Sequence, residues 1–389
     1  MTPTEPEHDP GDAPSDPAAD ASRPIDLTDE AALASLRQRI DDVDRRLIEA
    51  LSERARIVSD IGRSKRASGY PIYAPHREAE VLRRVLEANP GPLSDRTVEA
   101  IYRELMSGSF MLEQPIRVAF LGPEGSFSHV AAGRHFGHSV DLDPMDAIDT
   151  VFDEVATGRS TYGLVPYENS IGGGITDTLD AFQSHEVSIY AEALIEVRHS
   201  LLSNVPAAAI RRIHSKPQVF TQCRKFLAAR FPHAELVPSL SSSHAVRLVA
   251  EAGEDGDAAA IGSSLAGEIY GVKALFEHVE DVAGNITRFL VLARESARPS
   301  DDDRTTIMFV TAHRPGALVD VLGVFRDHGL NLSHIEKRPS RRENWEYTFF
   351  IDVDTHRESE PAIAAIAAAE RHCRLIRVLG SYPRAQRIL

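Results

Sequence analysis

The chain has 389 residues, enough for two to four domains that each bury a core of their own. Its 43 Lys and Arg residues against 58 Asp and Glu residues give a formal net charge of −15, which argues against nucleic acid or an anionic membrane as a partner. The two cysteines, Cys223 and Cys373, are too few and too far apart for a disulfide framework or a zinc site. We therefore expect a cytoplasmic protein that binds small molecules.

The first 28 residues are rich in Pro, Asp, Glu and Ala and contain no apolar run, so we expect a disordered tail without a signal peptide. Residues 29–114 are predicted to form a helical unit. From Leu36, apolar residues recur every three or four positions through Ile61, which predicts one long amphipathic helix that ends before Pro71.

Two shorter helices are expected after the long one. The first spans residues 76–87, and the second begins after Ser94 as its N-cap and reaches Leu112. Three helices bury little apolar surface alone, so we expect this unit to form a bundle with a second copy, which makes the protein a homodimer.

Basic side chains on the long helix are spaced to bind an anion. Arg54 and Lys65 are eleven residues apart, which returns them to nearly the same helical face, where both can reach one dianionic ligand. Arg37 lies about 100° away from that face and would more easily serve a partner's pocket. Ser109 and Glu113, four residues apart, form another facing pair.

This region resembles the all-helical chorismate mutase family through Leu36–Asp41, Glu53-Arg54, Lys65, Arg77-Glu78 and Ser109 to Glu113. The resemblance implies that chorismate is bound by Arg37, Arg54, Lys65, Arg77, Glu78, Ser109 and Glu113. The rearrangement is pericyclic and needs no nucleophile, only a compact substrate and positive charge at the ether oxygen. Lys65 and Glu113 are accordingly expected to be catalytic.

Two positions depart from the mutase pattern. Glu113 stands where some members have Gln, and a carboxyl group can donate a hydrogen bond to the ether oxygen only while it is protonated. We therefore predict that the mutase rate falls as the pH rises. Ala74 replaces an Asp of some relatives, so a side-chain contact is lost there while a backbone amide could still serve.

Residues 115–296 are predicted to form an α/β unit. An apolar strand at Ile116–Leu121 enters the glycine turn Gly122–Ser128, whose hydroxyls and free amides at a predicted helix start suit an anion. Further strands are expected at 162–166, 187–194 and 258–261, alternating with helices at 129–136, 147–157, 222–229 and 243–252.

Several kinds of chemistry lose support in this region. The dinucleotide fingerprint is absent, as is a phosphate loop followed by Lys-Ser or Lys-Thr, which argues against nicotinamide and ATP chemistry. The histidines lack a recognisable ligand spacing. We expect no cofactor and no metal.

Five blocks of the α/β unit together resemble the prephenate dehydratase family: Gly122–Ser128, Tyr167–Gly174, His199–Leu201, His214–Gln222 and Asn285–Phe289. The resemblance implies two α/β lobes with the active site in the cleft, as in periplasmic binding proteins. The implied prephenate-binding residues are Ser126, Glu168, Asn169, Ser170, Thr221, Thr287, Arg288 and Phe289.

The chemistry of such a dehydratase explains three consecutive residues of the last block. Loss of a ring hydroxyl and CO2 needs a hydrogen-bond donor, a cation for the remaining carboxylate and an apolar wall. Thr287, Arg288 and Phe289 are of these three types, and by resemblance Thr287 is the residue expected to be essential. Phe289 could equally be a core residue, since alternate residues of a strand face opposite sides.

Residues 304–389 show the βαββαβ order of a ferredoxin-like α+β unit. Arg314–Val319 and Glu336–Ser340 resemble two motifs of the ACT regulatory domain, in which paired copies bind amino acids. The implied phenylalanine site comprises Gly316, Ala317, Leu318, Val319, Glu336, Arg338 and Pro339. Lys337 replaces a usual Ser, and an ACT unit that only dimerises is the alternative.

In this order the three units resemble the bifunctional chorismate mutase/prephenate dehydratase family of phenylalanine biosynthesis, with feedback inhibition by phenylalanine. A sensor that only binds an amino acid is the competing hypothesis, which the charges of the helical unit oppose. A dehydratase that acts on arogenate is the alternative among enzymes.

Overall fold

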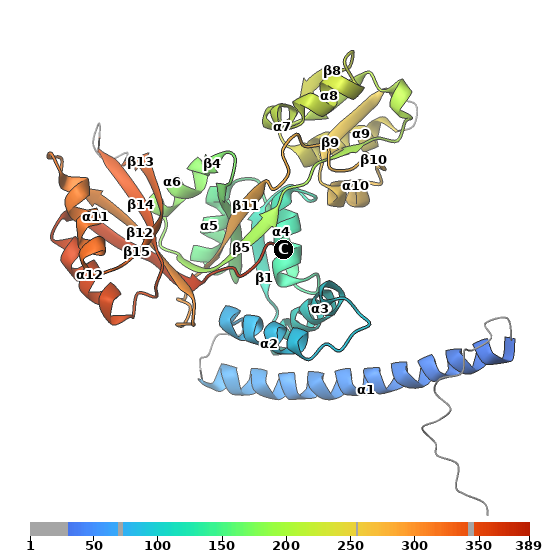
Figure 1. Ribbon diagram of the computed structural model, residues 1–389, viewed down its shortest axis with the longest axis horizontal. Helices are drawn as coiled ribbons and strands as arrows, with labels where there is room; N and C mark the ends of the chain where they lie inside the picture. Colours follow the sequence, from blue (N-terminus) through green and yellow to red (C-terminus); the bar gives the residue numbers. More distant parts are fainter. Residues whose placement is uncertain (1–29, 69–72, 254–255, 341–345) are drawn as a thin grey trace, which may run out of the picture. The chain divides into compact units, whose positions relative to one another are not determined.

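The computed structural model describes residues 30–68, 73–253, 256–340 and 346–389 (Figure 1). The expected disordered tail and Pro71, before which the long helix was predicted to end, lie outside these ranges. The chain divides into two compact units within its first helix, after Val58. Among the described residues, no helix combines the length and the apolar character needed to cross a membrane.

The helical region matches its prediction. Its helices are α1 (Glu30–Ser68), α2 (Pro75–Glu87) and α3 (Asp95–Glu113). Ser94 caps α3, because its hydroxyl accepts a hydrogen bond from the Thr97 amide at 3.2 Å. Gly62 has a packing role in α1: a Cβ there would lie 2.9 Å from the Cα of Glu113, so only glycine lets the two helices approach this closely.

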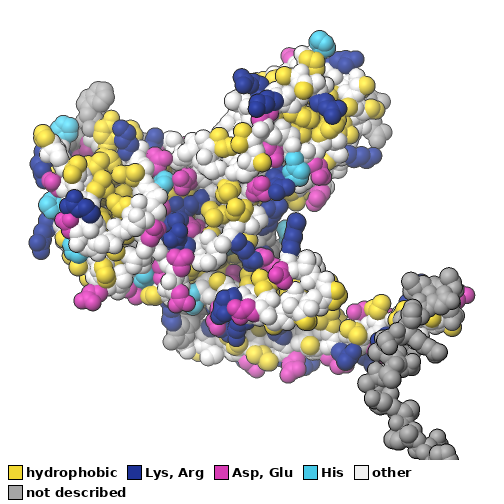
Figure 2. Space-filling view, viewed as in Figure 1, with side chains coloured by type: hydrophobic (Ala, Val, Ile, Leu, Met, Phe, Trp, Pro, Cys, Tyr) yellow, Lys and Arg dark blue, Asp and Glu magenta, His cyan; other side chains and the backbone are white. Residues whose placement is uncertain are grey.

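Helix α1 carries large apolar side chains on its surface, as Figure 2 shows along the helix. Ile40, Val43, Leu47 and Ile48 are all exposed. A single chain leaves these residues in water, which is the situation from which pairing with a second copy was predicted. The pairing itself stays a prediction.

The middle region has two lobes, each built on its own sheet. The sheet of the first lobe contains β1 (Arg117–Leu121), β2 (Asp141–Met145), β3 (Tyr162–Asn169), β4 (Gly173–Gly174), β5 (Ser188–Glu196) and β11 (Ile286–Ala293). Their order is β2-β1-β3-β11-β5, with β4 paired to β3. The helices of this lobe are α4 (Phe127–Phe136), α5 (Ile148–Ala156) and α6 (Thr176–Ser184).

The second lobe carries a sheet in the order β10-β6-β9-β7-β8. Its strands are β6 (Ser200–Leu202), β7 (Arg212–Ser215), β8 (Glu235–Pro238), β9 (Ala258–Gly262) and β10 (Ala274–Phe276). Its helices are α7 (Pro217–Gln222), α8 (Arg224–Arg230), α9 (Ser242–Ala252) and α10 (Ser264–Tyr270). The expected helix at 222–229 is thus two helices that meet at Cys223, because Pro217 starts the first and the Asp281 carboxylate accepts from the Lys225 amide at the start of the second.

The C-terminal domain has the predicted ferredoxin-like topology. Its elements are β12 (Asp303–Thr311), α11 (Ala317–Asp327), β13 (Leu332–Pro339), β14 (Tyr347–Val353), α12 (Glu360–Glu370) and β15 (Cys373–Pro383), with strand order β13-β14-β12-β15. Figure 1 shows α11 and α12 on one face of this sheet. Met308, Phe350 and Tyr382 on its other face belong to the hydrophobic core of the first lobe, so the two domains share a core.

Tyr73, which precedes α2, also lies in the core of the first lobe. It is 1% exposed and packs against Phe136 and Tyr162. Its hydroxyl is 2.6 Å from His135 Nε2, and its backbone oxygen accepts a hydrogen bond from Tyr190 at 2.7 Å. The helical region is therefore anchored to the first lobe by a residue far from the junction at 115.

Candidate functional site

The paired ends of β3 and β11 bring two of the sequence motifs together. The strands are antiparallel, with Thr287 opposite Asn169 and Arg288 opposite Glu168. Residues directly opposite each other point to the same face of a sheet, and their neighbours point to the other face. Asn169 and Thr287 therefore share one face, while Glu168 and Arg288 share the other.

Asn169 fixes the hydroxyl of Thr287. Its Nδ2 donates to Thr287 Oγ1 at 2.9 Å and to Asn285 Oδ1 at 2.6 Å, while its Oδ1 accepts from the amides of Ile171 and Gly172 at 3.1 and 2.8 Å. Because Thr287 Oγ1 accepts a hydrogen bond from Asn169, the hydrogen of its own hydroxyl points elsewhere. This buried threonine can thus donate a hydrogen bond to a bound molecule.

Ser170 links the same two strands. Its amide donates to the Ile286 carbonyl at 2.8 Å, and its hydroxyl accepts from the Ile286 amide at 2.9 Å. The side chain is exposed, and its hydroxyl hydrogen remains able to donate. Ser170 therefore lies beside Asn169 and Thr287, as predicted for one site.

The Arg288 side chain points to the face of the sheet opposite that of Thr287. The residue is 6% exposed, and its guanidinium donates to Glu192 at 2.7 Å, to Asp352 at 2.6 Å and to the Tyr382 hydroxyl at 2.8 Å. The predicted contact with a substrate carboxylate has no support in this arrangement. The alternation of a strand could have indicated this, because consecutive residues such as Thr287 and Arg288 face opposite sides.

Glu168 lies on the same face as Arg288. Its carboxylate is 3.7 Å from the Arg288 guanidinium and 3.5 Å from Nδ1 of His334 in the C-terminal domain. The hydrogen bond with His334 and the nearby positive charges lower the pKa of Glu168, although partial burial opposes them. Glu168 therefore stays ionised, and it bridges two domains.

The side chains of the other predicted residues of the α/β unit, all within the described ranges, make no hydrogen bond with Thr287 or Asn169. Phe289 is 1% exposed within the core of the first lobe, which supports its alternative role as a core residue. Ser126 caps α4: its hydroxyl accepts from the His129 amide at 3.2 Å and donates to the Leu121 carbonyl at 2.9 Å. Thr221 is exposed on α7 of the second lobe.

The glycine turn before α4 is one place where the second lobe contacts the first. Ser263 donates to the Gly125 carbonyl at 2.5 Å, and Ser243 donates to the carbonyl of Glu124. A Cβ at Gly125 would lie 2.7 Å from the Cα of Ala266, so glycine is needed for this approach. The turn thus joins the lobes, and the anion binding expected of it stays a prediction.

In the helical region, an ion pair joins two residues of the predicted chorismate site. Lys65 Nζ lies 2.9 Å from Glu113 Oε2, and Arg66 donates to the Glu113 carbonyl. Ser109 lies buried one turn before Glu113 and donates to the Leu105 carbonyl at 2.6 Å.

The other expected chorismate ligands are distributed over two helices. Arg77 is exposed on α2 and pairs with Glu80. Burial raises the pKa of the neighbouring Glu78 to about 7, with Arg103 opposing the shift. Arg37 and Arg54 lie on the part of α1 that precedes the division of the chain after Val58.

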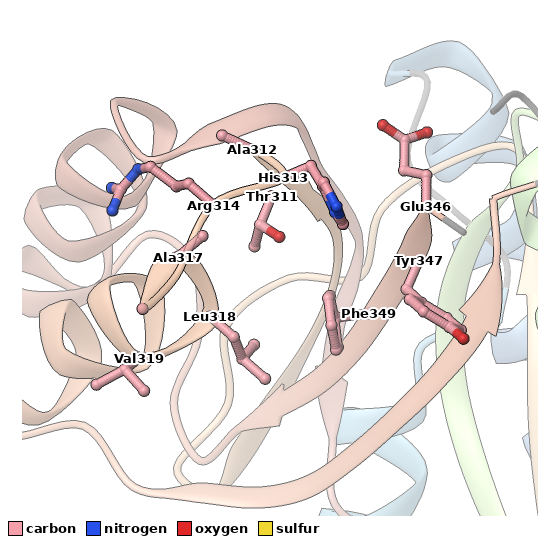
Figure 3. Close-up of a pocket in the computed structure, with 11 residues that line it drawn as sticks. Thr311, Ala312, His313, Arg314, Ala317, Leu318, Val319, Glu346, Tyr347 and Phe349 are labelled. Carbon is pink, nitrogen blue, oxygen red and sulfur yellow. The ribbon is translucent and has the colours of Figure 1, made fainter. Parts of the chain in front are cut away.

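The C-terminal domain has a cavity of about 240 Å³ at the start of α11. Figure 3 shows Leu318 and Phe349 on either side of it, with Thr311 and His313 at one end. The cavity is lined by all four predicted residues of the first ACT-like motif: Gly316, Ala317, Leu318 and Val319. Gly316 has φ +81°, a backbone conformation that residues other than glycine rarely adopt.

The three predicted residues of the second motif are not among the residues that line this cavity within one chain. Glu336 accepts a hydrogen bond from the Gly174 amide at 3.2 Å, and Arg338 binds both carboxylate oxygens of Asp180 at 2.9 Å. Pro339 is exposed at the end of β13. Glu336 and Arg338 thus contact the first lobe, at the elements that follow Asn169 and Ser170.

One group of side chains in the described part of the chain has the donor types of a metal site. Ligand atoms of Asp149, Asp153 and His185 lie within 4.8 Å of one another. Both aspartates are exposed, and His185 Nε2 is 3.1 Å from Asp153. The group lies on α5 and at the end of α6 and contains none of the predicted site residues.

Comparisons with known proteins agree with the three regions of the structure. The family "Chorismate mutase type II" matches residues 36–114, "Prephenate dehydratase" matches 118–297 and "ACT domain" matches 305–371. A bifunctional chorismate mutase/prephenate dehydratase of Stutzerimonas stutzeri is 41% identical over 92% of this chain and 100% of its own length. The chain belongs to this bifunctional family. The corresponding protein of Pseudomonas aeruginosa is 40% identical over the same shares.

A solved structure supports the assignment of the dehydratase and ACT regions. Prephenate dehydratase from Arthrobacter aurescens, in complex with L-Phe, is 33% identical and covers 69% of this chain and 90% of its own, with a TM-score of 0.64. The predicted fold classes of this bifunctional chain are confirmed: a helical mutase region, a two-lobed α/β dehydratase region and an ACT sheet.

The prediction for the dehydratase site omitted residues that the structure brings to it. Asn285 was part of a recognised block but not of the predicted site, although it lies two residues before Thr287 and such residues share a face of a strand. Asp352, Glu192 and His334 carry no local signal, because their contacts with the site motifs arise only from the packing of β14, β5 and β13.

Proposed function

We propose that this chain converts chorismate to prephenate in its helical region, and prephenate to phenylpyruvate, CO2 and water in its two-lobed region. Phenylalanine acts as the feedback inhibitor through the ACT domain. The match with bifunctional relatives over 92% of the chain supports both activities. The hydrogen bond from Asn169 to Thr287 is the observation that carries the choice of the dehydratase centre.

Thr287 is the proposed donor to the departing hydroxyl group of prephenate. The C–O bond breaks as the hydroxyl takes up a proton and leaves as water, while the electron pair of the breaking C–C bond enters the ring and releases CO2. A donor whose oxygen is already held by Asn169 has its hydrogen directed at the leaving group, so no reorganisation is required during the reaction. Asn169 and Ser170 position the substrate beside it.

In the mutase region, the proposed role of Lys65 and Glu113 is to stabilise negative charge on the ether oxygen of chorismate. Arg37, Arg54 and Arg77 bind its carboxylates and Glu78 its hydroxyl, with Arg37 acting in the pocket of a second copy. The Lys65–Glu113 ion pair supports a shared position for these two groups. The exposed apolar residues of α1 support a homodimer.

For regulation, we propose that phenylalanine binds at the α11 cavity, with Glu336, Arg338 and Pro339 contributed by a second copy. The L-Phe complex of the Arthrobacter aurescens enzyme supports phenylalanine as the ligand class. The cavity offers apolar side chains together with backbone amides at the start of a helix, which suit an amino acid with an aromatic side chain and a carboxylate.

The purified chain tests this proposal directly. We expect chorismate to be converted to prephenate and then to phenylpyruvate, with the second step inhibited by phenylalanine. Thr287→Ala should abolish the dehydratase step and leave the mutase step intact, while Thr287→Ser keeps the hydroxyl group and most of the turnover. Full dehydratase turnover in Thr287→Ala would refute the role of Thr287. Unchanged chorismate would favour the amino-acid sensor, and faster turnover of arogenate than of prephenate would favour the alternative substrate.

A further inference from the structure

The face of the dehydratase sheet opposite Thr287 holds a buried network of charges that joins two domains. Arg288 on β11 contacts Glu192 on β5 of its own lobe, and Asp352 and Tyr382 on β14 and β15 of the ACT domain. Arg304 of the ACT domain donates to the same Glu192 carboxylate at 2.9 Å. The network therefore has both positive and negative groups from each side of the domain boundary.

The acidic members of this network have their positions fixed from several directions. Asp352 is fully buried, and its second carboxylate oxygen accepts from Thr306 at 2.6 Å. The Tyr382 hydroxyl lies 2.6 Å from that of Thr306, so Arg288 meets a preorganised pair of acceptors. A buried guanidinium with two carboxylate partners and a phenol has little freedom to leave them for a substrate.

We propose that Arg288 is a positioning residue, which ties the strand bearing Thr287 to Asp352 and Tyr382 so that the ACT domain itself holds the dehydratase centre in its working geometry. This inference rests on the proposed dehydratase function. It departs from the expectation that Arg288 binds a carboxylate of prephenate.

The neighbouring strand supports the same conclusion. Glu168 on β3 lies beside Arg288 and also contacts His334 of the ACT domain, while the next residue, Asn169, donates to Thr287. Both strands that form the candidate centre thus contact the ACT sheet through the residue adjacent to the one that faces the substrate. A shift of the ACT sheet of a few tenths of an ångström acts directly on Thr287, where small displacements have large effects on rate.

Steady-state kinetics of four variants of the full-length chain test the proposal: Arg288→Lys, Asp352→Asn, Tyr382→Phe and the double variant Arg288→Lys/Asp352→Asn. We expect the dehydratase kcat to fall tenfold or more in the first two and at least threefold in Tyr382→Phe, with the KM for prephenate within threefold of the unaltered chain. The dehydratase kcat of the double variant should be no lower than that of the less active single variant, because both changes break the same connection. Asp302→Asn is the matched control, since this exposed carboxylate pairs with Arg384 within the ACT domain.

The mutase rate and the thermal unfolding of each variant show whether the chain is folded. Tyr382→Phe removes one oxygen atom and retains the packing, so it decides the question if Asp352→Asn does not fold. A tenfold rise in KM for Arg288→Lys with normal kinetics in Asp352→Asn and Tyr382→Phe would overturn the proposal and return Arg288 to the substrate site. Unaltered kcat in all variants would also overturn it. If the unaltered chain leaves prephenate unchanged, the proposed function fails instead.

Discussion

Replacement of Asn169 by Asp is the sharpest test of the dehydratase centre, because it changes one nitrogen to oxygen. The new carboxylate keeps the two hydrogen bonds accepted from the amides of Ile171 and Gly172. It loses the two bonds that Nδ2 donates to Thr287 and Asn285. The hydroxyl of Thr287 would then donate its hydrogen to the new carboxylate, and not to the substrate.

The size of the effect follows from these contacts. Two lost hydrogen bonds, at about 0.5 to 1.5 kcal/mol each, reduce the free energy of unfolding by about 1 to 3 kcal/mol. Removal of a positioned proton donor costs about 10²- to 10⁴-fold in rate, so we expect the dehydratase kcat of Asn169→Asp to fall by at least about 100-fold. The mutase rate should stay unchanged, because Lys65 and Glu113 lie in another region.

The assay measures phenylpyruvate formed from saturating prephenate, with prephenate formed from chorismate as the measure of folded protein. Asn89→Asp is a control: Asn89 Nδ2 also donates twice, to the Leu93 carbonyl at 3.0 Å and to Asp95 at 2.8 Å, but it lies in the connection between α2 and α3 and makes no hydrogen bond with the described strands β3 and β11 of the dehydratase centre. A dehydratase kcat within threefold of the unaltered chain in Asn169→Asp would refute the reasoning.

Three further predictions concern the helical region. Since the pKa of Glu78 is raised to about 7 in the folded chain, its ionisation lowers the free energy of unfolding progressively as the pH rises from about 4.5. At pH 8, thermal unfolding should therefore show Glu78→Gln to be more stable than the unaltered chain by about 1 to 3 kcal/mol. At pH 4 the two should be equally stable. Gly62→Ala should destabilise the chain by about 1 to 3 kcal/mol in denaturant titrations despite a better helix propensity, because the new Cβ meets the α3 backbone, whereas Gly108→Ala, with its nearest neighbour at 3.9 Å, should not. Glu113→Gln should retain the mutase rate, because its amide still donates a hydrogen bond to the ether oxygen, whereas Glu113→Ala should lower it; equal mutase rates in Glu113→Ala and the unaltered chain would contradict this role of Glu113.

The elements that the sequence predicted well are those with strong local signals. The spacing of apolar residues from Leu36 to Ile61 and the Ser94 cap defined α1 and α3, because helix periodicity and capping depend on near neighbours. The βαββαβ order of the ACT domain was likewise evident from the sequence. Short strands such as β4 and β10 were missed, since two or three residues carry no periodicity.

The candidate site was predicted in its chemistry more than in its geometry. Thr287, Asn169 and Ser170 come together as expected, because β3 and β11 pair directly. Arg288 and Glu168 point to the opposite face of the sheet. Arg288 contacts Asp352 there, and Glu168 contacts His334. Both partners belong to the C-terminal domain and lie more than sixty residues later in the chain. No pattern in a single sequence reports such contacts, because they depend on how one sheet packs on another.

The insertion of Tyr73 into the first lobe has a practical consequence for anyone who wishes to separate the two enzymes. A dehydratase fragment that starts at residue 115 would lose the ring that packs against both Phe136 and Tyr162, and it would leave His135 and the Tyr190 hydroxyl without these partners. A fragment that starts at residue 73 retains the Tyr73 ring together with α2 and α3. Expression trials of dissected enzymes should therefore place the cut in the connection after α1.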